Sequence, residues 1–126
     1  MTITPAKYIK ILSENIPSDL VYEHTILDTD YPGGYTLVIE DRDKLVTLTG
    51  TLPRTFTVPT DAAISFPIGT TVSFCQGGTG VLTISCSPTV TLFSENNALI
   101  LTGQHAMASA VKVDTNIWRV TGSLHP

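Results

Sequence analysis

Residues 71–86 read TVSFCQGGTGVLTISC and decide the fold class. Two short runs, in which apolar residues alternate with small or polar ones, flank the glycine-rich segment Gly77–Gly80. Alternation with a period of two is typical of strands that bury one face, and a glycine-rich link between two such runs is typical of a hairpin turn. The stretch therefore predicts two strands joined as a hairpin.

The same pattern recurs from Tyr35 onward, because apolar stretches are separated by Gly, Pro, Asn or Asp. The predicted strands are Tyr35–Glu40, Leu45–Thr49, Thr55–Val58, Thr70–Gln76, Val81–Cys86, Thr89–Phe93, Ala98–Thr102, Ala108–Asp114 and Ile117–Gly122. Short strands at roughly ten-residue spacing are typical of a sandwich or a barrel. We therefore expect residues 35–126 to form an all-β domain, an antiparallel β-sandwich or barrel.

The last two predicted strands meet at a tight turn, Asp114–Asn116. Val111 and Val113 alternate there with Lys112, and Trp118 alternates with Arg119. This alternation predicts a hairpin with one buried and one solvated face, and Trp118 is expected in the core.

Residues 1–34 have a different character, with three prolines, many of the acids and no clear strand. They are expected to form either an N-terminal arm that reaches over a neighbouring subunit or an irregular cap on the same domain. An arm that adds a strand to a neighbour's sheet edge gains backbone hydrogen bonds without a large apolar patch. The candidate partner-binding residues of this arm are Tyr8, Ile9, Ile11 and Leu12.

The chain is poor in charge, at 14% charged residues, against about 25% in an ordinary soluble domain. Fourteen of the eighteen charged side chains lie in residues 1–61. A small domain with so little charge has difficulty keeping its whole surface in water. We therefore expect partner subunits to cover surface in the C-terminal half.

Composition also argues against several partners. The net charge is −4 and no basic cluster is present, so nucleic acid is not an expected partner. Apolar runs such as residues 98–101 are far shorter than the roughly 18 residues of a membrane span. The N-terminus has no apolar signal region, so synthesis in the cytosol is expected.

Metal, cofactor and enzyme chemistry are not expected. On the predicted hairpin Cys75 and Cys86 point to opposite faces, so they should be free thiols, and no His stands near them at metal-ligand spacing. The acidic pairs Asp28/Asp30 and Asp41/Asp43 are only a weak signal for a hard cation. Gly77–Gly80 leads into a strand, whereas a phosphate-binding loop leads into a helix. The three histidines, His24, His105 and His125, are far apart in the sequence, and no Ser or Cys has the context of a nucleophile.

An ordered series of short segments resembles a β module of tailed-bacteriophage virion proteins. It comprises Tyr35–Leu37, Asp41–Val46, Thr57–Pro59, Phe66–Val72, Gln76–Ile84, Gln104–Ala106, Val111–Val113 and Asn116–Gly122. The series covers about 70% of the chain and leaves residues 1–34 unaccounted for.

The resemblance implies a non-enzymatic virion module, often trimeric, carried on tail fibres or other particle proteins. A free-standing module of this size resembles a head decoration (cement) protein. The resulting hypothesis is a homotrimer in the virion, made in the host cytoplasm, that stabilises the head by binding the major capsid protein or another virion protein. The alternative is a tail-fibre or tail-associated receptor-binding adhesin, for which the candidate glycan-binding aromatics are Tyr22, Tyr31 and Tyr35.

Overall fold

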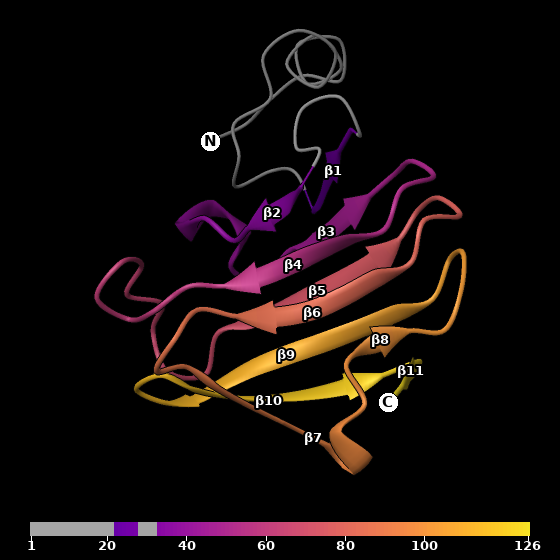
Figure 1. Cartoon of the computed structure of the whole chain (residues 1–126). Helices are drawn as coiled ribbons and strands as arrows, with labels where there is room; N and C mark the ends of the chain where they lie inside the picture. The colour runs from indigo at the N-terminus through magenta and orange to yellow at the C-terminus, as the bar shows by residue number, and fades with distance from the viewer. Residues whose placement is uncertain (1–21, 28–32) are drawn as a thin grey trace, which may run out of the picture.

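The computed structural model describes residues 22–27 and 33–126, and the regular secondary structure of this part of the chain is almost entirely strand (Figure 1). The strands are β1 (Glu23–Ile26), β2 (Gly34–Thr36), β3 (Leu45–Leu48), β4 (Arg54–Val58), β5 (Thr71–Gln76), β6 (Leu82–Cys86), β7 (Thr91–Ser94), β8 (Ile100–Leu101), β9 (Met107–Asp114), β10 (Ile117–Gly122) and β11 (Leu124–His125). Two short 3-10 turns, η2 (Ile39–Asp41) and η3 (Glu95–Asn97), interrupt them. None of the described helices is long and apolar enough to cross a membrane.

The strands form two sheets, and the chain alternates between them from β1 to β6. The six-stranded sheet has the order β1-β3-β5-β9-β10-β7, and the five-stranded sheet has the order β11-β8-β6-β4-β2. In the six-stranded sheet β1, β3 and β5 are parallel to one another, and in the five-stranded sheet β2, β4 and β6 are. Each successive pair of strands lies on the pair before it. Figure 1 shows this winding as successive rungs, in the manner of a solenoid, closed at the C-terminal end by β8 to β11.

The all-β prediction is confirmed, but the expected antiparallel arrangement holds only for part of the fold. Within the described residues, antiparallel pairing joins β9 to β5 and β10, and β8 to β6 and β11. The other pairings, including β7 with β10, are parallel. A period of two in the sequence indicates that one face of a strand is buried, but it does not indicate whether the neighbouring strand is parallel or antiparallel.

The predicted hairpin over residues 71–86 is wrong, because β5 and β6 belong to different sheets. The Gly77–Gly80 segment instead carries the chain from one sheet to the other, stacked on the equivalent turn of the previous rung. Gly77 N donates to Leu48 O at 2.8 Å, and Gly80 N donates to Gly50 O at 3.1 Å. A Cβ on Gly78 would lie 2.1 Å from Gly50 O, so the glycine is needed for close stacking of backbones.

A strand overlaps each of the nine predicted ones, and the structure adds β1 and β11. β10 has the predicted bounds, whereas the predicted strand Tyr35–Glu40 is wrong beyond Thr36, because its end lies in η2. β1 lies inside the segment expected to be an arm or cap, and it pairs in parallel with β3. Residues 1–21 and 28–32 lie outside the described residues, and with them Tyr8, Ile9, Ile11 and Leu12. The arm prediction for those four residues therefore stays a prediction.

The core lies between the two sheets and contains the largest apolar side chains. The Phe56 and Phe74 rings, one from each sheet, pack at 4.8 Å between centroids. Trp118 is 1% exposed and meets Phe66 edge-on at 5.6 Å, which confirms its predicted place in the core. Cys75 and Cys86 are free and lie in different sheets, so the predicted thiols are confirmed although the hairpin behind the argument is not.

The β9–β10 hairpin is confirmed, but the burial of β9 is inverted. Lys112 is 3% exposed and lies inside, whereas Val113 is 40% exposed and Val111 is half-buried on the outside. On β10 the expected pattern holds, with Trp118 inside and Arg119 exposed.

Candidate interaction surface

The six-stranded sheet presents a broad outer face, made of the residues that alternate with the core residues in each strand. We call it the outer face of the six-stranded sheet; it consists of Glu23, Thr25, Leu45, Thr47, Thr71, Ser73, Cys75, Thr91, Phe93, Met107, Ser109, Val111, Val113, Ile117, Arg119 and Thr121. Only two of these side chains, Glu23 and Arg119, are charged, and the exposed Asp114, which pairs with Ile117, adds a third charge at the turn end of β9. The face is otherwise a mixture of apolar and small hydroxyl side chains.

Three apolar side chains on this face, Phe93, Met107 and Val113, are exposed. Phe93 is 48% exposed and Met107 is 47% exposed. Together with Val111 and Val113 they lie over β7 and β9, in the half of the sequence that is nearly free of charge. Arg119 on β10 lies between Phe93 and Val111, so the exposed apolar side chains are separate groups on one weakly charged face. Such a face is a candidate interaction site.

Glu23 and Arg119 lie on opposite sides of β5. Glu23 is on the edge strand β1, in a row that continues through Leu45, Ser73 and Ser109. Arg119 is on β10, in the next row, beside Val111. Their separation across the sheet is therefore four strand spacings, or about 19 Å.

Neither charge has an ion pair within the described part of the chain. Glu23 Oε2 accepts a hydrogen bond from Thr47 Oγ1 at 2.5 Å. The Arg119 guanidinium lies over the Phe93 ring, 5.3 Å from its centroid. Each charge is thus only partly compensated and remains available to a charge of opposite sign from outside.

The outer face of the five-stranded sheet is richer in hydroxyl groups and has fewer charged side chains. Its strand residues are Thr36, Thr55, Thr57, Thr83, Ser85, Ile100 and His125, with no Asp, Glu, Lys or Arg among them. Hydroxyl groups hold water better than Phe93 or Met107, so this face is the less apolar of the two.

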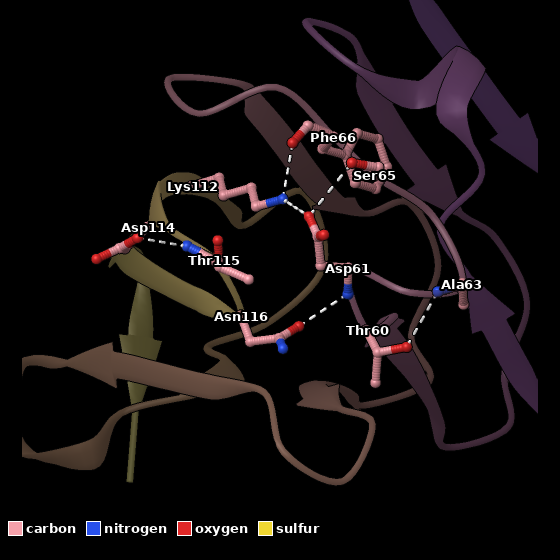
Figure 2. Close-up of polar contacts among 9 residues, drawn as sticks. All are labelled: Thr60, Asp61, Ala63, Ser65, Phe66, Lys112, Asp114, Thr115 and Asn116. Atoms are coloured by element: carbon pink, nitrogen blue, oxygen red, sulfur yellow. Dashed lines mark hydrogen bonds and ion pairs between the residues drawn. The ribbon is translucent and has the colours of Figure 1, made fainter.

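Part of the chain's small complement of charge is placed inside the fold. Lys112 Nζ donates to Asp61 Oδ1 at 2.5 Å and to the Phe66 carbonyl at 2.7 Å (Figure 2). The hydrogen bond from Lys112 holds the pKa of Asp61 below its ordinary value. Asn116 Oδ1 accepts from the Asp61 backbone N–H at 2.8 Å. These contacts fix the β4–β5 loop against the β9–β10 hairpin.

A second polar cluster centres on Asp41, which is fully buried. Its carboxylate accepts hydrogen bonds from Tyr35 OH at 2.7 Å and Val38 N at 2.9 Å, and it pairs with His24 Nδ1 at 2.9 Å. The cluster ties the edge strand β1 to β2 and η2. A carboxylate that orients a histidine is also found in catalytic triads, but the described hydrogen-bond partners of His24 are Asp41 and Tyr35, and neither is a hydroxyl or thiol nucleophile of the usual kind.

The structure separates the aromatic residues named for glycan binding. Tyr22 is 66% exposed, whereas Tyr35 is 3% exposed and donates its hydroxyl to Asp41. The prediction of Tyr35 as a glycan-binding surface residue is therefore wrong. Tyr31 lies outside the described residues. Phe93, which the sequence did not single out, is the exposed aromatic on the sheet face.

A small pocket lies where η3 meets the ends of β10 and β11. Its volume is about 190 Å³, below the roughly 300 Å³ at which small-molecule sites begin. Ser94, Asn96 and Thr121 contribute to its lining.

His105, expected as a polar loop residue, is exposed in a turn with a φ of 71°. Asp28 and Asp30 lie outside the described residues, and among those that are described no group of three or more His, Cys, Asp or Glu side chains could hold a metal ion.

The chain matches no protein-family model, no curated protein and no solved structure.

Proposed function

We propose that this chain is a structural subunit of a bacteriophage particle, and specifically a head decoration (cement) protein that binds the major capsid protein as a homotrimer. The observation that carries the proposal is the scarcity of charge on both sheet faces. Apart from the exposed Asp114 at the turn end of β9, the two outer faces hold only Glu23 and Arg119 as charged strand residues in the described part of the chain. A subunit whose broad surfaces are covered in its working state does not need charge there.

The energetics favour many weak contacts repeated over a particle. Burial of apolar surface contributes about 25 cal/mol per Å², so 100 Å² of covered Phe, Met and Val surface contributes roughly 2.5 kcal/mol before entropic costs. A shell carries many copies of such a contact. Modest stabilisation at each one then adds up to resistance against internal pressure.

The fold suits a clamp that keeps its shape. Successive rungs are joined by continuous backbone hydrogen bonds, and the glycine turns at one end stack without side chains between them. The Asp41 cluster ties β1 to β2 and η2, and Lys112 holds the β4–β5 loop. A rigid subunit loses little conformational entropy when it binds.

A tail-fibre or tail-associated adhesin is the second candidate, and the exposed aromatic side chains of Tyr22 and Phe93 favour it. Aromatic rings of this kind supply flat apolar area beside a polar surface, which suits a sugar ring. Glycan-array binding that is lost in Phe93→Ala would support the adhesin. An array without hits would count against it.

Copy number distinguishes the two candidates. Quantitative mass spectrometry of purified particles should find on the order of hundreds of copies for a protein on the symmetry axes of a shell, and fewer than about twenty for a tail protein. Absence of the chain from particles would overturn both.

A further inference from the structure

We propose that the outer face of the six-stranded sheet binds another copy of this chain. This inference rests on the proposed function, in which partner subunits cover the sheet faces, and it names the partner of this face. It leaves the hydroxyl-rich face of the five-stranded sheet for contacts with other proteins.

The face has the size that a specific interface requires. Six strands at about 4.8 Å spacing and five to six residues of length give a projected area of roughly 500 Å². Two such faces together bury about 1,000 Å², the lower end of the range for specific protein contacts. Phe93 and Met107 are about half exposed on this face, so a partner can cover part of each side chain.

The composition is that of an interface with an uncharged centre and charges toward its sides. Ser73, Ser109 and Val111 lie in the middle strands β5 and β9 and are half-buried. Ser73 Oγ and Ser109 Oγ hydrogen-bond one another at 2.9 Å, so their hydroxyls are satisfied before a partner arrives. Depletion of charge at the centre, with polar groups at the rim, is characteristic of protein interfaces.

Charge complementarity identifies the partner as another copy. In a pair whose two-fold axis runs along the strands, or in a ring joined head to tail through this face, the β1 side of one copy meets the β10 side of the next. Glu23 of each copy then lies near Arg119 of a neighbour, and both side chains lack an ion pair of their own in the described part of the chain. The two residues differ by one row, about 7 Å along the strand, which two long side chains can span.

The outer face of the five-stranded sheet has no comparable feature. Its strand residues include no Asp, Glu, Lys or Arg that would define a complementary partner. Thr57 and Thr83 on this face therefore serve as matched control positions.

The test is the molar mass of the purified full chain, measured by light scattering over a concentration series. Wild type should assemble into a dimer or trimer. Ser73→Arg, in the middle of the face, and each of the charge reversals Glu23→Arg and Arg119→Glu should raise the concentration for half-assembly about tenfold or more, because like charges then oppose one another. Thr57→Arg, Glu40→Arg and Arg42→Glu make equivalent changes off the face and should leave it unchanged.

Restoration of the pair makes the test specific. The double variant Glu23→Arg/Arg119→Glu should assemble like wild type. An equimolar mixture of the two single reversals should also assemble if the symmetry is two-fold, since every contact then joins opposite charges; in a three-fold ring one contact remains mismatched, and only the double variant is restored.

Circular dichroism and thermal unfolding of each variant exclude misfolding as the cause of any loss. A wild-type chain that stays monomeric at high concentration, or a double variant that is no better than the single ones, would overturn the self-association proposal. If the same chain is still abundant on particles, the proposed function stands and the face is covered by a different protein.

Discussion

Lys112 on β9 lies inside the fold and donates its Nζ to Asp61 Oδ1, while its neighbours Val111 and Val113 lie outside. The ordinary arrangement would be the reverse, with the valines in the core and the lysine in water. Here the lysine is satisfied by a carboxylate and the Phe66 carbonyl, and the valines enlarge an apolar outer face. β9 thus contributes Lys112 to the contacts that hold the β4–β5 loop, and it contributes the two valines to the candidate interaction surface.

Removal of the Lys112 charge should destabilise the fold. Lys112→Met keeps most of the buried stem but loses two hydrogen bonds and leaves the Phe66 carbonyl unpaired. Hydrogen bonds to charged groups contribute about 1.5–3 kcal/mol, and we expect the free energy of unfolding in urea to fall by about that amount. Lys44→Met, at a half-exposed turn position, should change it by less than about 0.5 kcal/mol. Equal effects of the two substitutions would contradict the structural role of Lys112.

Acid should weaken the interaction between Lys112 and Asp61. The hydrogen bond from Lys112, with its charge, holds the pKa of Asp61 below its ordinary value of 3.8. The folded chain therefore keeps Asp61 ionised where the unfolded chain has already taken up a proton. The stability from this group is fully present above pH 3.8 and is lost as the pH falls through the lower, folded-state pKa. The gap in urea midpoint between wild type and Asp61→Asn should narrow over that window, and a gap that is independent of pH would argue against the assignment.

Close stacking of the rung turns predicts that Gly78→Ala is harmful. Its Cβ would lie 2.1 Å from Gly50 O and 2.6 Å from Gly50 N, and neither backbone atom can move aside cheaply. We expect a loss of about 1–3 kcal/mol, as for overpacking in a core. Gly103→Ala is the matched control, because nothing lies within 4 Å of its Cβ position. Thermal unfolding that ranks the two variants equally would show that the turns are not packed in this way.

The buried Asp41 cluster predicts a specific role for one hydroxyl group. Tyr35→Phe removes the hydrogen bond to Asp41 Oδ2 and leaves the ring in place. The expected loss in the free energy of unfolding is about 1.5–3 kcal/mol, because the acceptor is a buried carboxylate. Tyr22→Phe removes a hydroxyl from a side chain that is 66% exposed and should have no measurable effect. Chemical denaturation of the two variants in parallel provides the comparison.

The sequence predicted the strands well because each has its own alternating pattern. β4 and β5, for example, alternate buried and half-buried residues along their whole length. The pairing of strands could not be read in the same way, since the Gly77–Gly80 link fits a hairpin and a turn between sheets equally well. The distinguishing contact, between Gly78 and Gly50, joins residues from different rungs and has no local signal.

The interaction surface was predicted only in outline. The shortage of charge in the C-terminal half was visible, but its distribution over two faces depends on which residues of each strand point outward. Lys112 was the misleading residue, because a lysine between two valines indicates a solvated position unless a distant Asp61 compensates it. β1 was missed because only Ile26 of its four residues is buried.

The central claim, that the outer face of the six-stranded sheet is covered in the working state, is tested most directly by hydroxyl-radical oxidation of Met107. This side chain is 47% exposed in the single chain and lies on that face. Its oxidation should be several-fold slower in purified particles than in the isolated Ser73→Arg chain, whereas Leu52 on an exposed turn provides the internal reference. Equal oxidation rates of Met107 in the particle and in the isolated chain would show that the face is open, and would contradict the account.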